Sequence, residues 1–245
     1  MSRFFLISIY LLLPHTYSMA SSQSIKYDAT FGIFGTIGSI ENTIKKENKK
    51  YTIHSTVTFS GLAKLLMGGQ TEYYISKGFI KKGLMISNFY SMASMKNDTK
   101  KLKEYFIDHE NKRVIKRVRK WKNKILVQET KEVLTFYAKN DLLTLYFNLG
   151  VAVATKGKTY HFKAVGLEKQ NGKVQITVPS LPEEKSYIKE LGAGSLLYAK
   201  ALIYQKNFKN KKGDILLSLA SDSYIEKCVI KDILMFGDAK IFRAK

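Results

Sequence analysis

Apolar and polar residues alternate along most of the chain beyond residue 20, which is the pattern of half-buried β-strands. In the segment 25–33, every second residue from Ile25 onward is apolar, whereas Lys26, Asp28 and Thr30 lie between them. Further alternating runs cover residues 51–59, 71–80, 84–95, 102–109, 124–134, 159–165, 173–178, 197–205, 214–220, 224–233 and 238–242. One apolar and one polar face on each strand predict a mainly β fold built on an antiparallel sheet.

Two segments interrupt the alternation. Asn140 is a suitable helix cap, Asp141 suits the first helical turn, and the sequence LLTLYFNL leads to Gly150 as a stop. Because apolar residues surround this helix on all sides, we expect it to be buried over residues 140–149 on the concave side of the sheet. The segment 179–194 predicts a loop with one or two helical turns over 182–191, which is a candidate lid. The predicted fold is a single antiparallel curved sheet or half-barrel of about a dozen strands, wrapped around one short buried helix.

Residues 1–20 have the features of a secretory signal peptide. Arg3 supplies the positive charge, residues 4–13 form an apolar run, and Ser18 and Ala20 supply the small residues of a cleavage site. The run is shorter than the span of about 20 apolar residues that a membrane anchor needs. We therefore expect cleavage near Ala20, a periplasmic location, and a single β-rich domain over residues 21–245. The one cysteine, Cys228, leaves no intrachain disulfide to form.

The chain is strongly basic, with a formal net charge of +21. Only five of the 41 basic residues are arginine, the residue that specific readers of bases and phosphates prefer. The excess of lysine therefore has two interpretations: a polyanionic partner, or a lysine-rich composition without one. For a chain with an export signal we expect no nucleic-acid partner. We expect a monomer rather than an oligomer.

The densest basic cluster covers residues 112–124, with eight basic residues in thirteen. Its apolar positions fit either a basic amphipathic helix at a membrane surface or the arms of a β-hairpin, and the β-branched residues favour the hairpin. As a hairpin, the cluster is either a solvated outer face or a docking stripe for an anionic membrane or glycan. The candidate docking residues are Lys116, Arg117, Arg119, Lys120 and Trp121.

Sequence motifs of catalysis and of metal binding do not occur with the required spacing. The glycines Gly32, Gly35 and Gly38 continue an alternating pattern, so we interpret them as points where a strand bends or a neighbour approaches closely. The histidines beyond the signal segment lie singly in expected strands, and the carboxylates show no pairing in the sequence. We predict no catalytic residue, no metal and no cofactor, and keep a carboxylate-dependent envelope enzyme as a minor alternative.

The chain contains 15 tyrosines and 14 phenylalanines, many of them on the apolar faces of the expected strands. A half-open sheet has more inward-facing surface than one short helix covers, and an apolar concavity is a common kind of ligand site. We therefore predict a non-catalytic protein that binds an apolar or amphipathic ligand, such as a lipid, in the concave face. The candidate lining residues are Phe79, Phe89, Tyr146, Phe147, Phe162 and Tyr204.

The order of several segments resembles an exported bacterial family, domain of unknown function 3108 (DUF3108), over roughly residues 27–245. The segments that carry the resemblance are YDATFGIFGTIGSI, YFIDHENKRV, NDLLTLYFNLG, YHFKAVGLEKQNGK, LSLASDSYIEKCVI and MFGDAKIFRA. A proline common in the family after the Asp222 region is replaced by Glu226 or Lys227. The resemblance implies a periplasmic curved sheet or half-barrel around a helix. It implies no catalytic residue, because the family has no established activity.

Overall fold

The computed structural model describes residues 20–32, 35–66, 69–167, 169–205, 208, 212–233 and 237–244. The expected signal segment therefore lies outside the described residues, apart from Ala20. No helix within these ranges has the length and apolar character needed to cross a bilayer.

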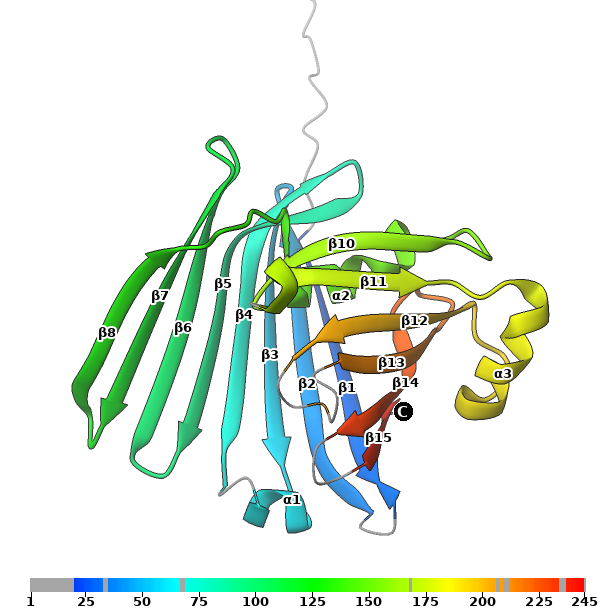
Figure 1. The fold of residues 1–245 in the computed structure, drawn as a ribbon, viewed down its shortest axis with the longest axis horizontal. Helices are drawn as coiled ribbons and strands as arrows, with labels where there is room; N and C mark the ends of the chain where they lie inside the picture. The colour runs from blue at the N-terminus through cyan, green and yellow to red at the C-terminus, as the bar shows by residue number, and fades with distance from the viewer. Residues whose placement is uncertain are drawn as a thin grey trace, which may run out of the picture.

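One large sheet contains the strands of the described chain (Figure 1). Its first eight strands are β1 (Ser21–Phe31), β2 (Thr36–Glu47), β3 (Lys50–Phe59), β4 (Thr71–Lys81), β5 (Leu84–Lys96), β6 (Thr99–Asp108), β7 (Arg113–Lys122) and β8 (Ile125–Val133). The others are β9 (Asn140–Asp141), β10 (Thr159–Val165), β11 (Lys173–Thr177), β12 (Leu197–Tyr204), β13 (Lys212–Leu219), β14 (Ile225–Ile233) and β15 (Gly237–Arg243). In the described chain three α-helices accompany the sheet: α1 (Gly61–Leu66), α2 (Leu142–Ala152) and α3 (Leu181–Leu191). A short 3-10 helix covers Lys169–Gly172.

The strands follow the order β8-β7-β6-β5-β4-β3-β2-β1-β15-β14-β13-β12-β11-β10-β9. All neighbours are antiparallel except β9 and β10, which are parallel. The first and last strands of the chain, β1 and β15, lie side by side and join the two halves of the sheet. Because the halves run in different directions, the sheet curves around α2 (Figure 1). This confirms the predicted mainly β fold with a single curved sheet.

Helix α2 lies where the hydrophobic clusters of the two halves meet. Leu145 and Leu149 belong to the cluster formed with β10–β14, and Phe147 belongs to the cluster formed with β1–β5. The side chain of Leu143 packs against a third cluster, which includes Tyr90 of β5. A helix that is apolar on nearly every side thus finds apolar partners in several directions, as the sequence predicted.

The ends of α2 differ from the prediction. Asp141, rather than Asn140, is the N-cap, because its side chain accepts a hydrogen bond from the Thr144 backbone N–H at 2.8 Å. At the other end, Gly150 stays helical and the helix continues to Ala152. A Cβ atom on Gly150 would collide with Ser223, so this glycine serves a close helix–loop contact rather than a helix stop.

Helix α3 forms over the predicted residues but on the other side of the sheet. Leu191 packs with Tyr198 and Val229, whereas the neighbouring Leu197 and Ala199 face the cluster around α2. Successive side chains of a strand point to opposite faces. Helix α3 therefore covers the outer face of β12–β14, and it is not a lid over the concave side as the sequence had suggested.

The glycines of the 32–38 motif lie where a neighbouring strand approaches closely and where the chain turns, as predicted. Gly38 faces the adjacent strand so closely that a Cβ atom would collide with the Thr58 carbonyl oxygen. The ladder between β1 and β2 shifts register beside Gly38, which is the mark of a β-bulge. Gly35 has a φ of +66°, a conformation that favours glycine.

Candidate functional site

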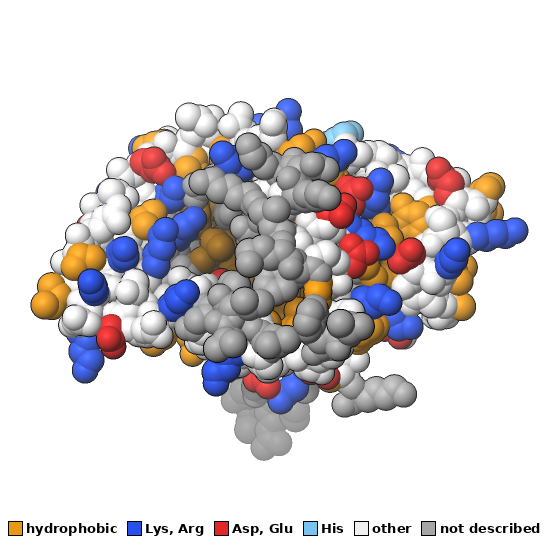
Figure 2. Space-filling model, turned by 60° about the horizontal axis from the view of Figure 1, so that its bottom comes forward, with side chains coloured by type: hydrophobic (Ala, Val, Ile, Leu, Met, Phe, Trp, Pro, Cys, Tyr) orange, Lys and Arg blue, Asp and Glu red, His pale blue; other side chains and the backbone are white. Residues whose placement is uncertain are grey.

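A pocket of about 380 Å³ lies between α2 and the concave face of the sheet. Small-molecule sites commonly measure about 300–1,000 Å³ and are lined mostly by apolar side chains. Both halves of the sheet and the helix contribute apolar residues to this pocket: Ile40, Val57, Met92, Leu143, Ile225 and Ile241. Figure 2 shows the corresponding hollow, with hydrophobic side chains at its base. The pocket is the candidate site for an apolar ligand.

Polar side chains enter this pocket from β2 and β3. Asn42 and Ser55 are directly opposite on the two strands and are only 2% and 5% exposed. Both occupy positions that alternation assigns to the apolar face, next to Ile53 and Val57. A few polar groups within an apolar lining give a ligand its orientation. The sequence analysis missed these residues. The sign that could have indicated them is a polar residue at a position where the alternation expects an apolar one.

Two tyrosines join α2 to the sheet at the pocket wall. The Tyr146 hydroxyl hydrogen-bonds the Tyr27 hydroxyl, which donates to the Ile225 carbonyl oxygen at 2.9 Å. Burial raises the pKa of both phenols, most strongly that of Tyr146. This wall of the pocket is therefore uncharged and held in place by hydrogen bonds from β1, β14 and the helix.

One carboxylate, that of Glu72 on β4, lines the pocket. Its oxygens accept hydrogen bonds from the Tyr74 hydroxyl and from Gln70 Nε2, the latter at 2.5 Å. Burial, together with the charge of Glu72, raises the pKa of Tyr74, so the phenol keeps its proton. The carboxylate thus has protein donors on both oxygens.

A buried polar network fixes the start of α2 against β4. Asp141 is 0% exposed, and its carboxylate accepts hydrogen bonds from Ser76 Oγ at 2.6 Å and Thr144 Oγ1 at 2.8 Å. Tyr51 of β3 extends the network, with its hydroxyl 2.8 Å from Thr144 Oγ1. Burial raises the pKa of Asp141, and the hydrogen bonds to its carboxylate partly oppose that shift.

A second polar contact fixes the middle of α2 against β5. The Asn148 side chain accepts from the Met85 N–H at 3.0 Å and donates to the Met85 carbonyl oxygen at 2.8 Å. Asn148 is 3% exposed, so this pair of hydrogen bonds lies inside the core. These two contacts hold one wall of the pocket in a fixed position, which pre-organises it for a ligand.

The structure places the predicted lining residues in four different surroundings. Tyr146 lines the pocket. Phe147 lies in the core, with its ring 4.7 Å from that of Tyr146. Phe162 is partly buried against the cluster of β10–β14 and stacks on Tyr160. Tyr204 is half-buried at the end of β12, next to the lining residue Gln205.

Phe79 and Phe89 lie on the outer face of the sheet. The ring of Phe89 is 5.4 Å from that of Phe106, which is 41% exposed, and the ring of Phe79 is 5.7 Å from that of His109. Strict alternation from Met85 would turn Phe89 inward. A bulge at Asn88, where β5 has one residue more than β4, turns Phe89 outward and Tyr90 inward instead.

The basic cluster 112–124 forms β7 and the turns beside it, as the hairpin interpretation predicted. Its candidate docking residues therefore alternate between the two faces of the sheet. Lys116 pairs with Glu132 at 2.8 Å on the concave face, whereas Arg117 and Arg119 pair with Glu129 and Glu104, each at 2.7 Å, on the outer face. Lys120 lies opposite Lys101, on the concave face.

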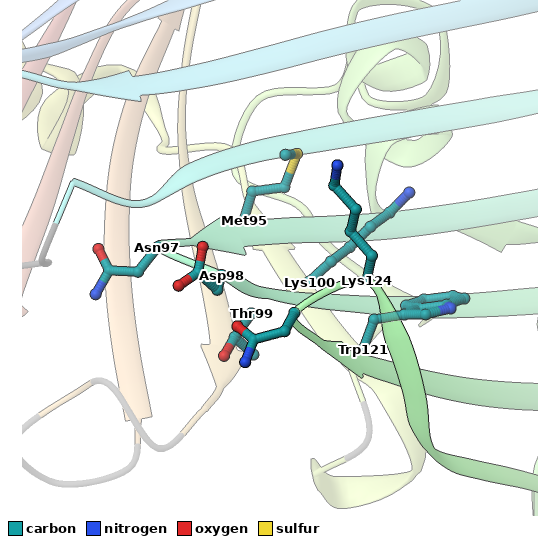
Figure 3. A pocket seen from close by; sticks show the side chains of 8 residues that line it. Met95, Asn97, Asp98, Thr99, Lys100, Trp121 and Lys124 are labelled. Carbon is teal, nitrogen blue, oxygen red and sulfur yellow. The ribbon is translucent and has the colours of Figure 1, made fainter.

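Trp121 lies at a separate hollow of about 720 Å³ near the tips of the β5–β6 and β7–β8 hairpins (Figure 3). Lys100 Nζ is 5.4 Å from the centre of the indole ring, and Arg119 Cζ is 5.3 Å from it. The remaining lining comes largely from polar turn residues, among them Asn97, Asp98 and Asn123. The hollow is larger than the concave pocket but suits an apolar ligand less well.

In the part of the chain that the structure describes, no group of three or more His, Cys, Asp or Glu side chains is placed to hold a metal ion. The ring of His109 is occupied by structural contacts, with Nδ1 2.8 Å from the Tyr137 hydroxyl and Nε2 2.9 Å from the Ser87 carbonyl oxygen.

Comparison with known proteins adds a structural neighbour. No family model matches the chain, and no curated protein gives a significant match. The fold is similar to the crystal structure of a beta-barrel-like protein of domain of unknown function DUF1849 from Brucella abortus. The TM-score is 0.52 at 8% identity, over 91% of this chain and 95% of that one. This likeness shows a β-barrel-like fold, and the resemblance to DUF3108 stays a prediction.

Proposed function

We propose that this protein is a non-catalytic binding protein that holds the apolar part of an amphipathic ligand in its concave pocket. The observation that carries the proposal is the pocket itself, about 380 Å³ of mostly apolar lining around a helix fixed by buried hydrogen bonds. A β-barrel-like fold is compatible with this role, since such folds enclose ligands on their inner faces.

We also propose that the protein works in the bacterial periplasm. Support comes from the signal-like residues 1–20 and from the resemblance to the exported DUF3108 family. Amphipathic envelope molecules would then be the available ligands.

The experiment is native mass spectrometry of protein purified from its own cell envelope, compared with two tryptophan variants of β3. Val57 lines the pocket, so Val57→Trp fills it. Thr58 is the next residue and is exposed on the other face, so Thr58→Trp is the matched control. We expect the parent and Thr58→Trp to carry the added mass of a co-purified small molecule. Val57→Trp should lack this added mass. A ligand-free parent, or an equal load on Val57→Trp, would contradict the proposal.

Docking of a basic stripe on an anionic surface is the alternative, and the structure supports it less. The candidate residues Lys116, Arg117 and Arg119 each have a carboxylate partner at 2.7–2.8 Å, and they lie on two opposite faces. A stripe divided in this way presents less charge to a single planar surface.

A further inference from the structure

The inner face of the sheet continues from the apolar pocket onto a basic region of β6 and β7. Directly opposite pairs lead along one row from Tyr74 of β4 to Met92 and then to Lys103. The next row leads from Glu72 through Ser94 to Lys101 and Lys120. Side chains that are opposite on neighbouring strands have Cβ atoms only about 5 Å apart. The pocket wall and the lysines thus belong to one continuous surface.

A smaller pocket of about 90 Å³ bridges the two regions. It shares Glu72, Tyr74 and Met92 with the concave pocket, and on its other side it is lined by Lys101 and Lys103. Figure 2 shows Lys and Arg side chains on the β6–β8 side of the hollow, next to the hydrophobic side chains within it. An elongated molecule in the concave pocket can reach these ammonium groups with its other end.

The glutamates that the structure describes beside this surface already have partners. Glu132 pairs with Lys116, which lies opposite Tyr105, and Glu72 accepts hydrogen bonds from Tyr74 and Gln70. Within the described chain, the ion pairs of β7 use Arg113, Lys116, Arg117 and Arg119, and none of them uses Lys101 or Lys120. Two lysines opposite each other on neighbouring strands repel, so an anion between them would relieve an unfavourable contact.

We propose that the ligand is an anionic single-chain amphiphile, with its hydrocarbon chain in the concave pocket and its acidic head group at Lys101, Lys103 and Lys120. This inference rests on the proposed function and adds the chemical class of the ligand. The pocket volume lies at the lower end of the usual range for ligand sites, which favours one chain over several. Ammonium groups act as point charges without bidentate geometry, so they select for the charge of the head group.

The test measures the affinity of three probes that share a twelve-carbon chain, each below its micellar concentration, by isothermal titration calorimetry at pH 8. Dodecanoate carries a negative head group, dodecyldimethylamine oxide is uncharged overall, and dodecyltrimethylammonium is positive. The purified protein is compared with the double variant Lys101→Gln, Lys120→Gln. The matched control is Lys100→Gln, Lys131→Gln, which removes the same two charges from the outer face of β6 and β8.

We expect the parent to bind dodecanoate about tenfold more tightly than the amine oxide, and the trimethylammonium probe most weakly. The Lys101, Lys120 double variant should lose about tenfold in dodecanoate affinity, since each partly exposed charge pair is worth a few-fold. The control double variant should lose less than about twofold in dodecanoate affinity. The amine oxide should bind the parent and both double variants with equal affinity.

Three results would overturn the inference alone, and they differ from failure of the proposed function. Equal binding of all three probes by the parent, or equal losses of dodecanoate affinity in the two double variants, would leave a binding pocket without head-group selection. Absence of binding for every probe, or undiminished binding by Val57→Trp, would remove the pocket function and the inference together. Preferred binding of the cationic probe would indicate recognition by Glu72 instead, which also overturns the inference.

Discussion

Replacement of Asp141 tests whether the buried network holds α2 against the sheet. In the structure its carboxylate caps the helix through the Thr144 N–H at 2.8 Å and accepts from Ser76 Oγ at 2.6 Å. Asp141→Ala removes the cap, which costs about 0.5–2 kcal/mol, and leaves buried donors without an acceptor, which costs about 1–3 kcal/mol more. We therefore expect the free energy of unfolding to fall by about 1.5–5 kcal/mol.

A second helix N-terminus supplies the control. Ser180 precedes α3 at the surface, where its N–H and hydroxyl donate to the Glu183 carboxylate at 2.8 and 2.6 Å. Because that site is exposed, Ser180→Ala should cost only about 0.5–1 kcal/mol. Asp141→Asn keeps an oxygen for the Thr144 N–H, and its cost should lie between those of the two alanine variants.

The pH dependence of the Asp141→Asn effect follows from the raised pKa of the buried carboxyl. The folded protein binds this proton more tightly than the unfolded chain, whose aspartates titrate near about pH 3.9. The parent therefore loses stability, relative to the asparagine variant, as the pH rises from that value through the folded pKa. Urea denaturation at several pH values measures this. The reasoning would be refuted if Asp141→Ala lowered the free energy of unfolding no more than Ser180→Ala does. It would also be refuted if the destabilisation caused by Asp141→Asn grew as the pH rises.

Two further predictions concern the pocket and the basic stripe. Burial raises the pKa of the Cys228 thiol to about 12, so at pH 8 it should react with iodoacetamide on the order of a thousandfold more slowly than an ordinary cysteine. The labelling rate should rise about tenfold for each pH unit above 8, and a rate near that of glutathione at pH 8 would contradict the burial. Glutamine substitutions at Arg117, Arg119 and Lys120 should change binding to anionic vesicles by less than about threefold, because Arg117 and Arg119 already have carboxylate partners and Lys120 lies on the opposite face of the sheet. Vesicle sedimentation at low salt measures this affinity for the triple variant of Arg117, Arg119 and Lys120. A loss of two orders of magnitude in affinity would instead favour docking.

Strand positions and the buried helix could be predicted from the sequence because each depends on local periodicity. The run 25–33 alternates without interruption, and its residues 25–31 form most of β1, whose inward residues Ile25 and Tyr27 are buried. The helix around LLTLYFNL was expected in the core for the same reason: a solvated face is missing from its sequence. These features need no knowledge of which strand lies next to which.

The face of the sheet on which each residue lies, and the residues that line the pocket, depended on long-range geometry. One additional residue, Asn88, reverses the phase of β5, so Phe89 points away from the pocket that alternation assigned to it. Helix α3 was correctly placed in the chain, but its sequence carries no information on which face of the sheet it covers. Asn42 and Ser55 were missed because a polar residue in an apolar row gains meaning only when the opposite strand is known.

The most direct measurement of the central claim is a crystal structure of the protein with dodecanoate bound. The account predicts continuous density for the hydrocarbon chain between α2 and β1–β5, in contact with Val57, Leu143 and Tyr146. The carboxylate should lie toward Lys101 and Lys103, in the direction of the smaller pocket. Density confined to the hairpin-tip hollow around Trp121 or to the outer face, with the concave pocket closed by its own side chains, would contradict the account.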